Sequence, residues 1–542
     1  MPFTEEEKEL LRPFVSNPDR NVFVAHVPGL TGAIFARYSR AKGGFREVLL
    51  QEFIRGGQLD AQKADGLIKR VLVAFGDDSV GELDGTHLSF EQVSNLATKV
   101  IEDKRIGGSP IEQSSRYVFY DEKVDGKFKF LREPRIMQSK HAKAYEDILN
   151  RCFEVYCELI EPMQEHFRRI LPLEAAEFKL RDDWPCKKRL EELIDERERK
   201  DFERTYRETI RTKACDTIRV VLPAATLTNL GIFGNGRFFQ GLLTEMYSHP
   251  LSEMNGLARL AHQELDKYIK RYVERAKPNE YLTKKHAAVQ RIADELLGNI
   301  HPALSQEKVT LLPNLRDQRE FLDFTIATML FPYVEHPTTQ IRSFAAGLPQ
   351  DRKLEILVRY NGDRKSRRDR PGRGLEFGYP FTYDIIGDFG IYRDLHRHRM
   401  VTQQRQRLTT RLGFSTPEEI TEAGLDYMVR EAADISSDLY EKLRQDLREE
   451  AQYAVLFGFD QRWNMGMNAR ELMHLTEIRT IPQGHKNYRR VAKEMHALAL
   501  KRDPEIATLM GFVDYKDYPF ARGDAEAKQR AKEFNLDEKV QR

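Results

Sequence analysis

Apolar and polar residues alternate over some short segments of the chain and recur at helical spacing over others. Alternation is typical of strands, and a spacing of about 3.6 residues is typical of helices. In the first half, residues 21–25 predict a strand, and a helical region runs from Ala36 toward Phe75. An apolar stretch then leads into residues 101–104. The first half is therefore predicted to contain both helices and strands.

The second half repeats this order of segments. Residues 308–312 predict a strand, residues 318–330 a helix, and the alternating residues 377–383 another strand. An arginine-rich segment begins at Arg393. Because the order resembles that of the first half, we expect a weak internal repeat, and the predicted fold class is α+β with a mixed sheet packed against helices in each half.

Changes in composition indicate where the halves begin and end. The first copy of the repeat is predicted at residues 1–275, a helical linker at 276–307 and the second copy at 308–520; these copies are called the first and second halves below. Charged residues crowd positions 167–214, which predicts an exposed helical insertion of structural character. Residues 521–542 are charged and lack apolar periodicity, so they are expected to be disordered.

Composition excludes several classes of protein. Hydrophobic residues make up 40% of the 542 residues, which is too many for a wholly disordered chain. No apolar run approaches the ~20 residues of a membrane span, and the acidic start at residues 1–7 is unlike a secretory signal. Lysine and arginine total 87 against 85 acidic residues, so the net charge of +2 argues against a protein that coats nucleic acid. Four cysteines without a Cys-x-x-Cys pair predict no disulfide scaffold and no metal site, and we expect a cytoplasmic protein.

Three segments carry residues that are suited to binding anions. In the first, Gly107-Gly108 precedes residues 109–117, where Ser114 offers a hydroxyl and Arg116 a forked guanidinium of the kind that binds phosphate. The alternative for this segment is a turn followed by a strand with a solvated arginine.

The second segment, residues 393–411, is rich in arginine. A helix here would place Arg393 and Arg397 on one face, four residues apart. Such a cluster needs an acidic side chain, a phosphate or an anionic cofactor as its partner. A solvated basic face is one alternative, and a groove for nucleic acid is the other.

The third segment, residues 468–479, predicts a helix with an apolar stripe at Leu472, Leu475 and Ile478. The stripe leaves four polar residues available for other contacts: Asn468, Arg470, His474 and Arg479. A histidine in such a place is more often a helix residue with ordinary partners than a catalytic group, so the interest lies in the cluster.

Together these segments resemble the flavin-dependent thymidylate synthase family, whose signature is R-H-R-x-x-S-x-N-E-x-S-x-R-Y. The first half has Lys104-Arg105-Ile106 in place of the leading triplet. It keeps the later positions Ser109, Glu112, Ser114, Arg116 and Tyr117. The second half keeps the triplet Arg397-His398-Arg399, but its later positions are Thr402, Gln404, Arg405, Arg407 and Thr409.

The downstream pattern of the family, an arginine four residues before a proline and then N-x-R, also occurs twice. The first half has Arg219 before Pro223 and then Asn235-Gly236-Arg237, with Met246 at the place of the final arginine. The second half has Gln452, Leu456, Asn468-Ala469-Arg470 and the final Arg479. Each half therefore keeps what the other has lost, as expected of a fused duplication whose copies share one composite site.

The resemblance implies a role for each matching residue. Arg479 is the catalytic residue, an arginine that favours a negatively charged uracil ring. The residues that bind the nucleotide substrate are Glu112, Gln113, Ser114, Ser115, Arg116 and Arg219. The residues that bind the cofactor are Arg397, His398, Arg399, Asn468, Arg470, His474 and Glu82.

The resemblance further implies a methyltransferase that converts dUMP to dTMP, with FAD as hydride carrier, methylene-tetrahydrofolate as carbon donor and NADPH as reductant. It implies a homodimer, since the family forms tetramers of a single-copy fold, and no membrane or nucleic-acid partner. A related nucleotide-modifying flavoenzyme, or a homologue that binds nucleotide without turnover, is the first alternative. A nucleic-acid-binding protein that uses the stripe from Arg393 to Arg411 is the second.

Overall fold

A computed structural model describes residues 3–28, 30–38, 41–55, 58–59, 81–303, 307–366, 369–521, 523–529 and 531–532. Its residues group into two compact units. Unit 1 comprises Met1–Val93, Ala97–Gln113 and Thr228–Thr283, and unit 2 comprises Ser94–Leu96, Ser114–Leu227 and Lys284–Arg542. Unit 2 therefore combines segments of both halves of the sequence.

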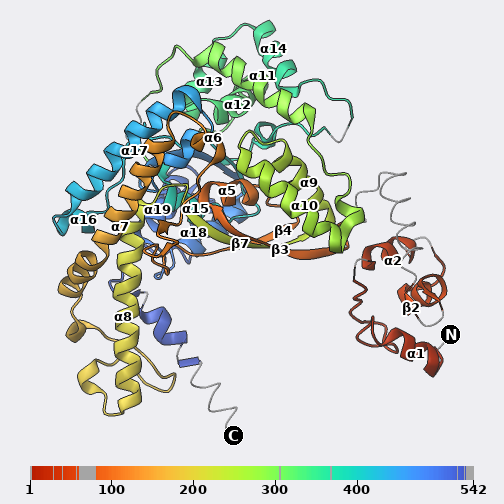
Figure 1. Cartoon of the computed structure of the whole chain (residues 1–542), viewed down its shortest axis with the longest axis horizontal. Helices are drawn as coiled ribbons and strands as arrows, with labels where there is room; N and C mark the ends of the chain where they lie inside the picture. The colour runs from red at the N-terminus through yellow and green to blue at the C-terminus, as the bar shows by residue number, and fades with distance from the viewer. Residues whose placement is uncertain are drawn as a thin grey trace. The chain divides into compact units, whose positions relative to one another are not determined.

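Unit 1 contains an N-terminal group of short elements followed by a sheet with its helices (Figure 1). These elements, wholly or for the most part in unit 1, are α1 (Glu5–Leu11), α2 (Thr31–Tyr38), α3 (Phe45–Val48), η1 (Leu49–Phe53), β1 (Ile54–Arg55), β2 (Gln58–Leu59), β3 (Gly85–Ser94), α5 (Asn95–Glu102), β4 (Gly108–Glu112), β7 (Leu227–Asn235), α9 (Gly236–Tyr247) and α10 (Ser252–Val273).

The start of the chain differs from the sequence prediction. The strand expected at residues 21–25 is not formed; Ala25 makes an isolated bridge to Val15, while Val22 and Val24 are 86% and 69% exposed. The apolar residues there have no partner strand, and the small core around them is built by α1, α2, α3 and η1. The long helical region expected beyond Ala36 is broken into short helices and the β1–β2 hairpin, and the part at residues 60–80 lies outside the described residues.

Unit 2 contains the remaining elements. They are β5 (Lys123–Val124), β6 (Lys127–Phe128), α6 (Pro134–Met137), α7 (Ala142–Ile170), η4 (Leu173–Ala175), η5 (Leu190–Glu192), α8 (Glu196–Ile218), η6 (Arg219–Val221), α11 (Glu280–Leu297, which begins in unit 1), β8 (Val309–Leu311), α12 (Gln318–Leu330), η7 (Phe331–Tyr333), α13 (Thr338–Ala346), α14 (Gln350–Asn361), η8 (Arg373–Glu376), β9 (Phe381–Asp388), α15 (Phe389–Leu395), β10 (Thr402–Arg405), α16 (Glu418–Glu422), α17 (Asp426–Asp446), η9 (Glu450–Ala454), β11 (Asp460–Met467), α18 (Ala469–Arg479), α19 (Lys486–Arg502) and α20 (Pro504–Ala507).

The two sheets have the same strand order, which shows the internal repeat in three dimensions. The sheet of unit 1 has the order β3-β7-β4, and that of unit 2 has the order β10-β11-β9-β8. In both sheets the third strand of the repeat, β7 or β11, lies between the first and second strands, and β8 is an additional edge strand in unit 2. A helix follows the first strand of each repeat, and an asparagine caps the helix that follows the third. The α+β class is confirmed; all three strand pairs in the sheet of unit 2 are antiparallel, so that sheet is not mixed in direction.

The sheet of unit 2 is buried on both faces. Every residue of β9 and β11 is buried, although antiparallel strands commonly leave one face in water. The register pairs Ile385 with Trp463 on an apolar face and Asp384 with Asn464 on a polar one. Asp384 accepts a hydrogen bond from the first backbone N–H of α13, so helices also cover the polar face.

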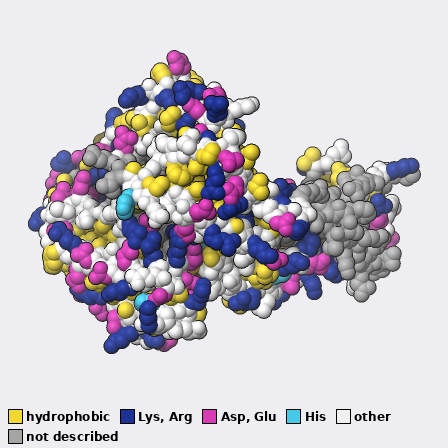
Figure 2. All heavy atoms as spheres, turned by 90° about the horizontal axis from the view of Figure 1, so that it is seen from above, with side chains coloured by type: hydrophobic (Ala, Val, Ile, Leu, Met, Phe, Trp, Pro, Cys, Tyr) yellow, Lys and Arg dark blue, Asp and Glu magenta, His cyan; other side chains and the backbone are white. Residues whose placement is uncertain are grey.

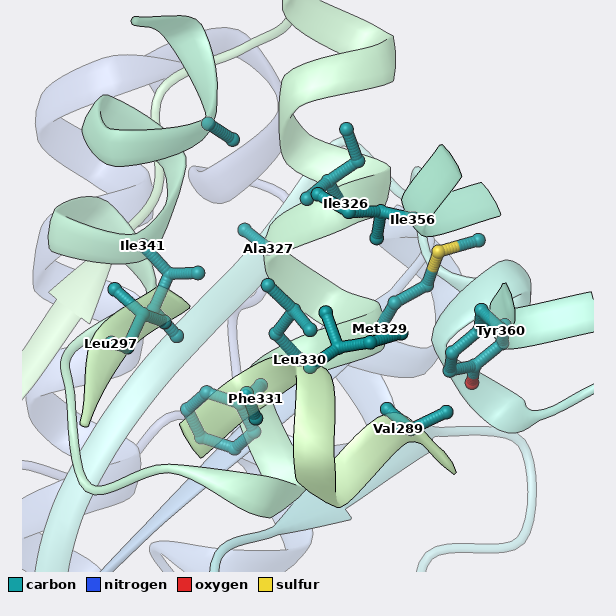
Figure 3. Packing of buried hydrophobic residues seen from close by; sticks show 13 residues of the cluster. Val289, Leu297, Ile326, Ala327, Met329, Leu330, Phe331, Ile341, Ile356 and Tyr360 are labelled. Carbon is teal, nitrogen blue, oxygen red and sulfur yellow. The ribbon is translucent and has the colours of Figure 1, made fainter. Parts of the chain in front are cut away.

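Four helices, α11 to α14, form a separate apolar cluster in unit 2 (Figure 3). Ile326 and Leu330 of α12 lie at its centre, and Val289 and Leu297 of α11 pack against them. The helix predicted at residues 318–330 matches α12 residue for residue. The segment expected to be a helical linker therefore contributes α11 to a packed core.

Equivalent residues of the two halves face each other inside unit 2. Pro223 and Leu456, which occupy the same place in the repeat, form an antiparallel bridge, and backbone hydrogen bonds continue on both sides of it. Likewise α7 and α17, each between the second and third strand of its repeat, pack in opposite directions, with Arg151 paired to Glu431 (Figure 1). An antiparallel pair of equivalent residues is the signature of a local two-fold axis.

In the described part of the chain, no helix has the length and apolar character that crossing a membrane requires.

Candidate functional site

The order of strands in unit 2 brings two functional motifs together. After β9, α15 carries Arg393 and Asp394, and the chain then reaches His398 just before β10. Because β10 begins opposite the end of β11, with Thr402 paired to Gly466, His398 arrives beside the start of α18. The motif with the intact R-H-R triplet and the motif Asn468-x-Arg470 are therefore neighbours through the sheet register.

A buried group of arginines and carboxylates lies where the two halves meet in unit 2. Arg116 Nε and Nη2 lie 2.8 and 2.7 Å from Asp216 Oδ2. Arg219 Nη2 donates to Asp394 Oδ2 at 3.2 Å, and Arg219 Nε lies 3.5 Å from Asp216 Oδ1. These four residues are called the arginine–aspartate quartet below. Its members come from both halves of the sequence.

Ser115 connects the quartet to the second half. Its Oγ accepts a hydrogen bond from Arg393 at 3.0 Å and lies 3.5 Å from Nη1 of Arg219. Gly390, in the first turn of α15, leaves room for this packing, because a Cβ there would lie 3.3 Å from the guanidinium of Arg219. A serine of the first half thus touches two arginines, one from each half.

His398 and Arg479 form a second cluster. Nε2 of His398 accepts a hydrogen bond from Nε of Arg479 at 2.8 Å, so its Nδ1 carries the proton and donates to Glu471 at 3.1 Å. This arrangement describes a neutral imidazole, and burial lowers the pKa of His398 below its ordinary value. The guanidinium of Arg479 is held in one orientation by a buried acceptor.

Tyr488 lies between the two clusters. The guanidinium carbons of Arg116 and Arg479 are 5.9 and 5.8 Å from the centre of its ring, within the range of cation–π contact. His485, which caps α19, lies with Nε2 4.0 Å from Asp216 Oδ1, and burial lowers the pKa of His485 to about 4. The start of α19 therefore joins the quartet to the His398–Arg479 cluster.

Several of the residues expected to bind a cofactor lie on the surface beside this cluster. Arg397, Arg399, Asn468, Arg470 and His474 are exposed, whereas His398 is buried. The ring of His474 lies 5.9 Å from that of His398. Asn468 also has a structural task, since its side chain accepts from the backbone N–H of Glu471 and caps α18.

Of the other predicted site residues, Ser114 belongs to unit 2, where its Oγ accepts from the backbone N–H of Arg116, and three belong to unit 1. Glu82 forms an ion pair with Arg237, the arginine of the first N-x-R motif. Glu112 is buried, where its carboxylate pairs with the fully buried Lys99 at 2.9 Å and accepts from Thr98. Gln113 accepts a hydrogen bond from Asn229. Each of these three side chains thus has partners within unit 1.

One prediction about a helix near the site was wrong. The helix that was to align Arg393 with Arg397 ends at Leu395, because the chain must turn there to enter β10. The arginines of this stripe consequently do not share a face: Arg393 is buried, Arg407 pairs with Glu449, and Arg411 with Glu441. Figure 2 shows basic and acidic side chains interspersed over the visible face. The stripe at 468–479 is shorter than expected, since Ile478 is 42% exposed.

Sequence reasoning missed four residues of the site: Asp216, Glu471, His485 and Tyr488. One signal was available for Asp216, which precedes Arg219 by three residues and so shares its face of the helix. No spacing rule pointed to His485 or Tyr488, because their contacts depend on how α19 packs. Asp216 lies two residues beyond the charged insertion predicted at 167–214, on the helix α8 that continues from it.

The residue pattern of the thymidylate synthase complementing protein family, Thy1, matches residues 31–269 and 375–505 of the chain. This chain belongs to that family. The two matched segments lie in the two halves, in keeping with a fused duplication of the flavin-dependent thymidylate synthase fold.

Relatives of similar length share most of the chain. UPF0159 proteins of Chlamydia muridarum and Chlamydia pneumoniae are 36% and 35% identical, covering 98% and 97% of this chain and 99% and 98% of their own lengths. A UPF0159 protein of Thermoplasma acidophilum is 32% identical over 92% of this chain and 98% of its own. The similarity therefore extends over both halves of this chain and nearly the whole length of each relative.

Proposed function

We propose that this Thy1 protein catalyses the reductive methylation of dUMP to dTMP in the cytoplasm, with FAD, NADPH and methylene-tetrahydrofolate. The observation that supports this most directly is the contact between halves in unit 2. Ser115 and Arg219 of the first half lie within 3.5 Å of Arg393 and Asp394 of the second. The ring of Tyr488 likewise contacts Arg116, which the first half has kept, and Arg479, which the second half has kept, as a composite site requires.

The donors of the buried group suit the nucleotide. Arg116 and Arg219 offer guanidinium groups, and Ser115 a hydroxyl, for the phosphate of dUMP. Arg479 offers a fixed positive charge for the negative charge that develops on the uracil ring, a form of stabilisation that requires no reorientation during the reaction. His398 and the ring of Tyr488 keep that guanidinium in place.

The exposed residues beside His398 fit an anionic cofactor. The guanidinium groups of Arg397, Arg399 and Arg470 carry only hydrogen-bond donors, and the side-chain amide of Asn468 adds a further donor group. Such a set suits the pyrophosphate and the pyrimidine edge of FAD, which would supply the hydride. Ser114 and His474 complete the proposed site in unit 2, and Glu82, Glu112 and Gln113 of unit 1 are proposed on the family signature alone.

The absorption spectrum of the purified protein tests the proposal first. We expect the absorption bands of bound flavin. If the protein is purified without flavin, we expect it to bind FAD tightly when FAD is added back. The second step measures dTMP formed from dUMP with methylene-tetrahydrofolate and NADPH. A protein that neither carries nor binds FAD would refute the flavoenzyme, and a yellow protein that binds dUMP without product would favour a non-catalytic homologue.

A further inference from the structure

Both arginines that are expected to hold the substrate phosphate already have carboxylate partners. Arg116 directs two N–H groups to one oxygen of Asp216, and Arg219 lies between Asp216 and Asp394. The side chains of Arg219, Asp216 and Asp394 are 4%, 10% and 15% exposed, so water screens these pairs little. The quartet contains two positive and two negative charges and is neutral as a whole.

The two carboxylates stay ionised at neutral pH. Arg219 and Arg116 lower the pKa of Asp394 strongly below its ordinary value, against the opposing effect of burial. The same arginines, with His485, lower the pKa of Asp216. A phosphate that approaches Arg116 or Arg219 therefore meets two negative charges already in place.

Resting on the proposed function, we propose that Asp216 and Asp394 are specificity-determining residues that compete with the substrate phosphate for Arg116 and Arg219. A phosphate gains these arginines only by exchanging with a carboxylate, so it contributes little net affinity. The rest of the nucleotide must then carry recognition, and the site accepts a pyrimidine nucleoside nearly as well as its monophosphate.

The experiment compares dUMP with deoxyuridine, which lacks the phosphate, by calorimetric titration of the full chain. Asp394→Asn and Asp216→Asn each remove one negative charge and keep the shape of the side chain. In the unaltered protein we expect dUMP to bind less than about tenfold tighter than deoxyuridine. In either variant this preference should rise by roughly tenfold to a hundredfold, the range of one charge-assisted hydrogen bond.

Glu441→Gln is the matched control. It removes the carboxylate from another two-pronged pair, with Arg411, in which both side chains are partly exposed at the surface. The preference of this variant for dUMP over deoxyuridine should equal that of the unaltered protein. Melting temperatures establish that each variant is folded before binding is compared.

Two results would overturn the inference. One is a preference for dUMP that stays constant or falls in both aspartate variants, since Asp216 and Asp394 would then position the arginines instead of competing for them. The other is an equal rise in Glu441→Gln. If the unaltered protein binds neither nucleoside nor nucleotide, the proposed function fails, and inorganic phosphate becomes the probe. The inference then requires at least about tenfold tighter phosphate binding by both aspartate variants.

Discussion

Arg116 and Arg397 belong to different halves of the sequence, yet both lie in unit 2 around Asp394. We expect Arg397→Ala to reduce kcat/KM by roughly tenfold to a hundredfold, because it removes a guanidinium proposed to hold the cofactor, and Arg116→Ala to reduce it by less than about tenfold, because Asp216 already offsets that charge. The measurement is kcat/KM on protein shown to be folded. The size of the Arg116 effect also depends on the competition from Asp216, so binding of dUMP is measured beside turnover.

The same positions in the opposite halves provide the controls. In the second half, Thr409 occupies the position that corresponds to Arg116. In the first half, Lys104 occupies the position that corresponds to Arg397, and it pairs with Glu245. Thr409→Ala and Lys104→Ala should leave kcat/KM nearly unchanged, although Thr409→Ala lowers stability because its hydroxyl is buried and bonded. Equal damage from Lys104→Ala and Arg397→Ala would mean that each half runs a site of its own.

His485 links the site to the pH dependence of stability. Burial lowers its pKa from 6.5 to about 4 in the folded chain, so between these values the unfolded chain binds a proton that the folded chain does not. Stability therefore falls as the pH drops from about 6.5 toward 4, by about 3 kcal/mol for this residue in total. His485→Asn keeps a capping side chain for α19 and removes the titrating group.

Urea unfolding at pH 7 and at pH 5 measures this effect. The loss of unfolding free energy between the two values should be smaller in His485→Asn than in the unaltered protein. Asp216 and Asp394 contribute little to this loss, because their pKa values in the folded chain lie below the ordinary 3.8 and both carboxylates stay ionised between pH 7 and 5. An identical loss in both proteins would show that His485 is protonated in the folded chain.

For single residues, the sequence predicted which side chains belong to the site better than it predicted their contact partners. Arg116, Arg219, His398 and Arg479 were recognised because the signature places them at characteristic spacings. Asp216 and Glu471 were missed because the role of a carboxylate depends on the side chain with which it pairs, and these contacts depend on sheet register and helix packing. Burial of Arg393 and of Lys99 was equally invisible in a local pattern.

The elements show where local pattern is sufficient. Residues 318–330 form α12 as predicted because apolar residues and an N-cap aspartate at position 317 agree with the tertiary packing. Residues 21–25 do not form a strand, since alternation cannot supply a partner strand. The helix at 393–399 ends early for a topological reason: β10 has to start opposite the end of β11.

The asparagine caps of α9 and α18 separate a structural role from a cofactor role. Asn235 accepts from the N–H of Phe238 at 2.8 Å, and Asn468 accepts from that of Glu471 at 3.0 Å. Each replacement by alanine should cost about 1 kcal/mol of stability. Only Asn468→Ala should also weaken FAD binding, because the first motif has its arginine paired with Glu82.

Asn468→Asp sharpens this test, since aspartate also caps a helix but brings a negative charge to the proposed cofactor surface. We expect near-normal stability and weak FAD binding in this variant. Fluorescence titration with FAD and urea unfolding supply the two readouts. Weakened FAD binding in Asn235→Ala of the same size as in Asn468→Ala would contradict the assignment of the cofactor to the second half.

For the whole molecule, the duplication predicts how many chains assemble. If four copies of the fold surround the sites, as the family resemblance implies, two chains supply them. Light scattering should then give a mass of twice 63.2 kDa. Closed two-fold assembly is also the commonest symmetry of soluble oligomers. A mass of one chain at micromolar concentration would contradict the dimer.

The local two-fold axis in unit 2 leads to a prediction about stoichiometry. A symmetric pair of copies would create two equivalent nucleotide sites, but the second half has Gln452 in place of Arg219 and Thr409 in place of Arg116. Gln452 keeps the counterpart of one contact, since its side-chain oxygen accepts from the backbone N–H of Leu408, the residue equivalent to Ser115. Its neutral amide adds no positive charge for a phosphate.

Neutral side chains thus replace both arginines of the quartet at this counterpart position, and Arg407, at the place of Ser114, donates to Glu449 at 2.9 and 2.6 Å. One nucleotide should therefore bind per chain, and two per dimer. Calorimetric titration with dUMP gives the number of sites, and light scattering on the same sample gives the number of chains. A value near two per chain would show that the second half retains a working site despite its lost arginines. A value near one, with an affinity that Arg116→Ala weakens and Thr409→Ala leaves unchanged, would place the single site where the buried arginines of both halves meet.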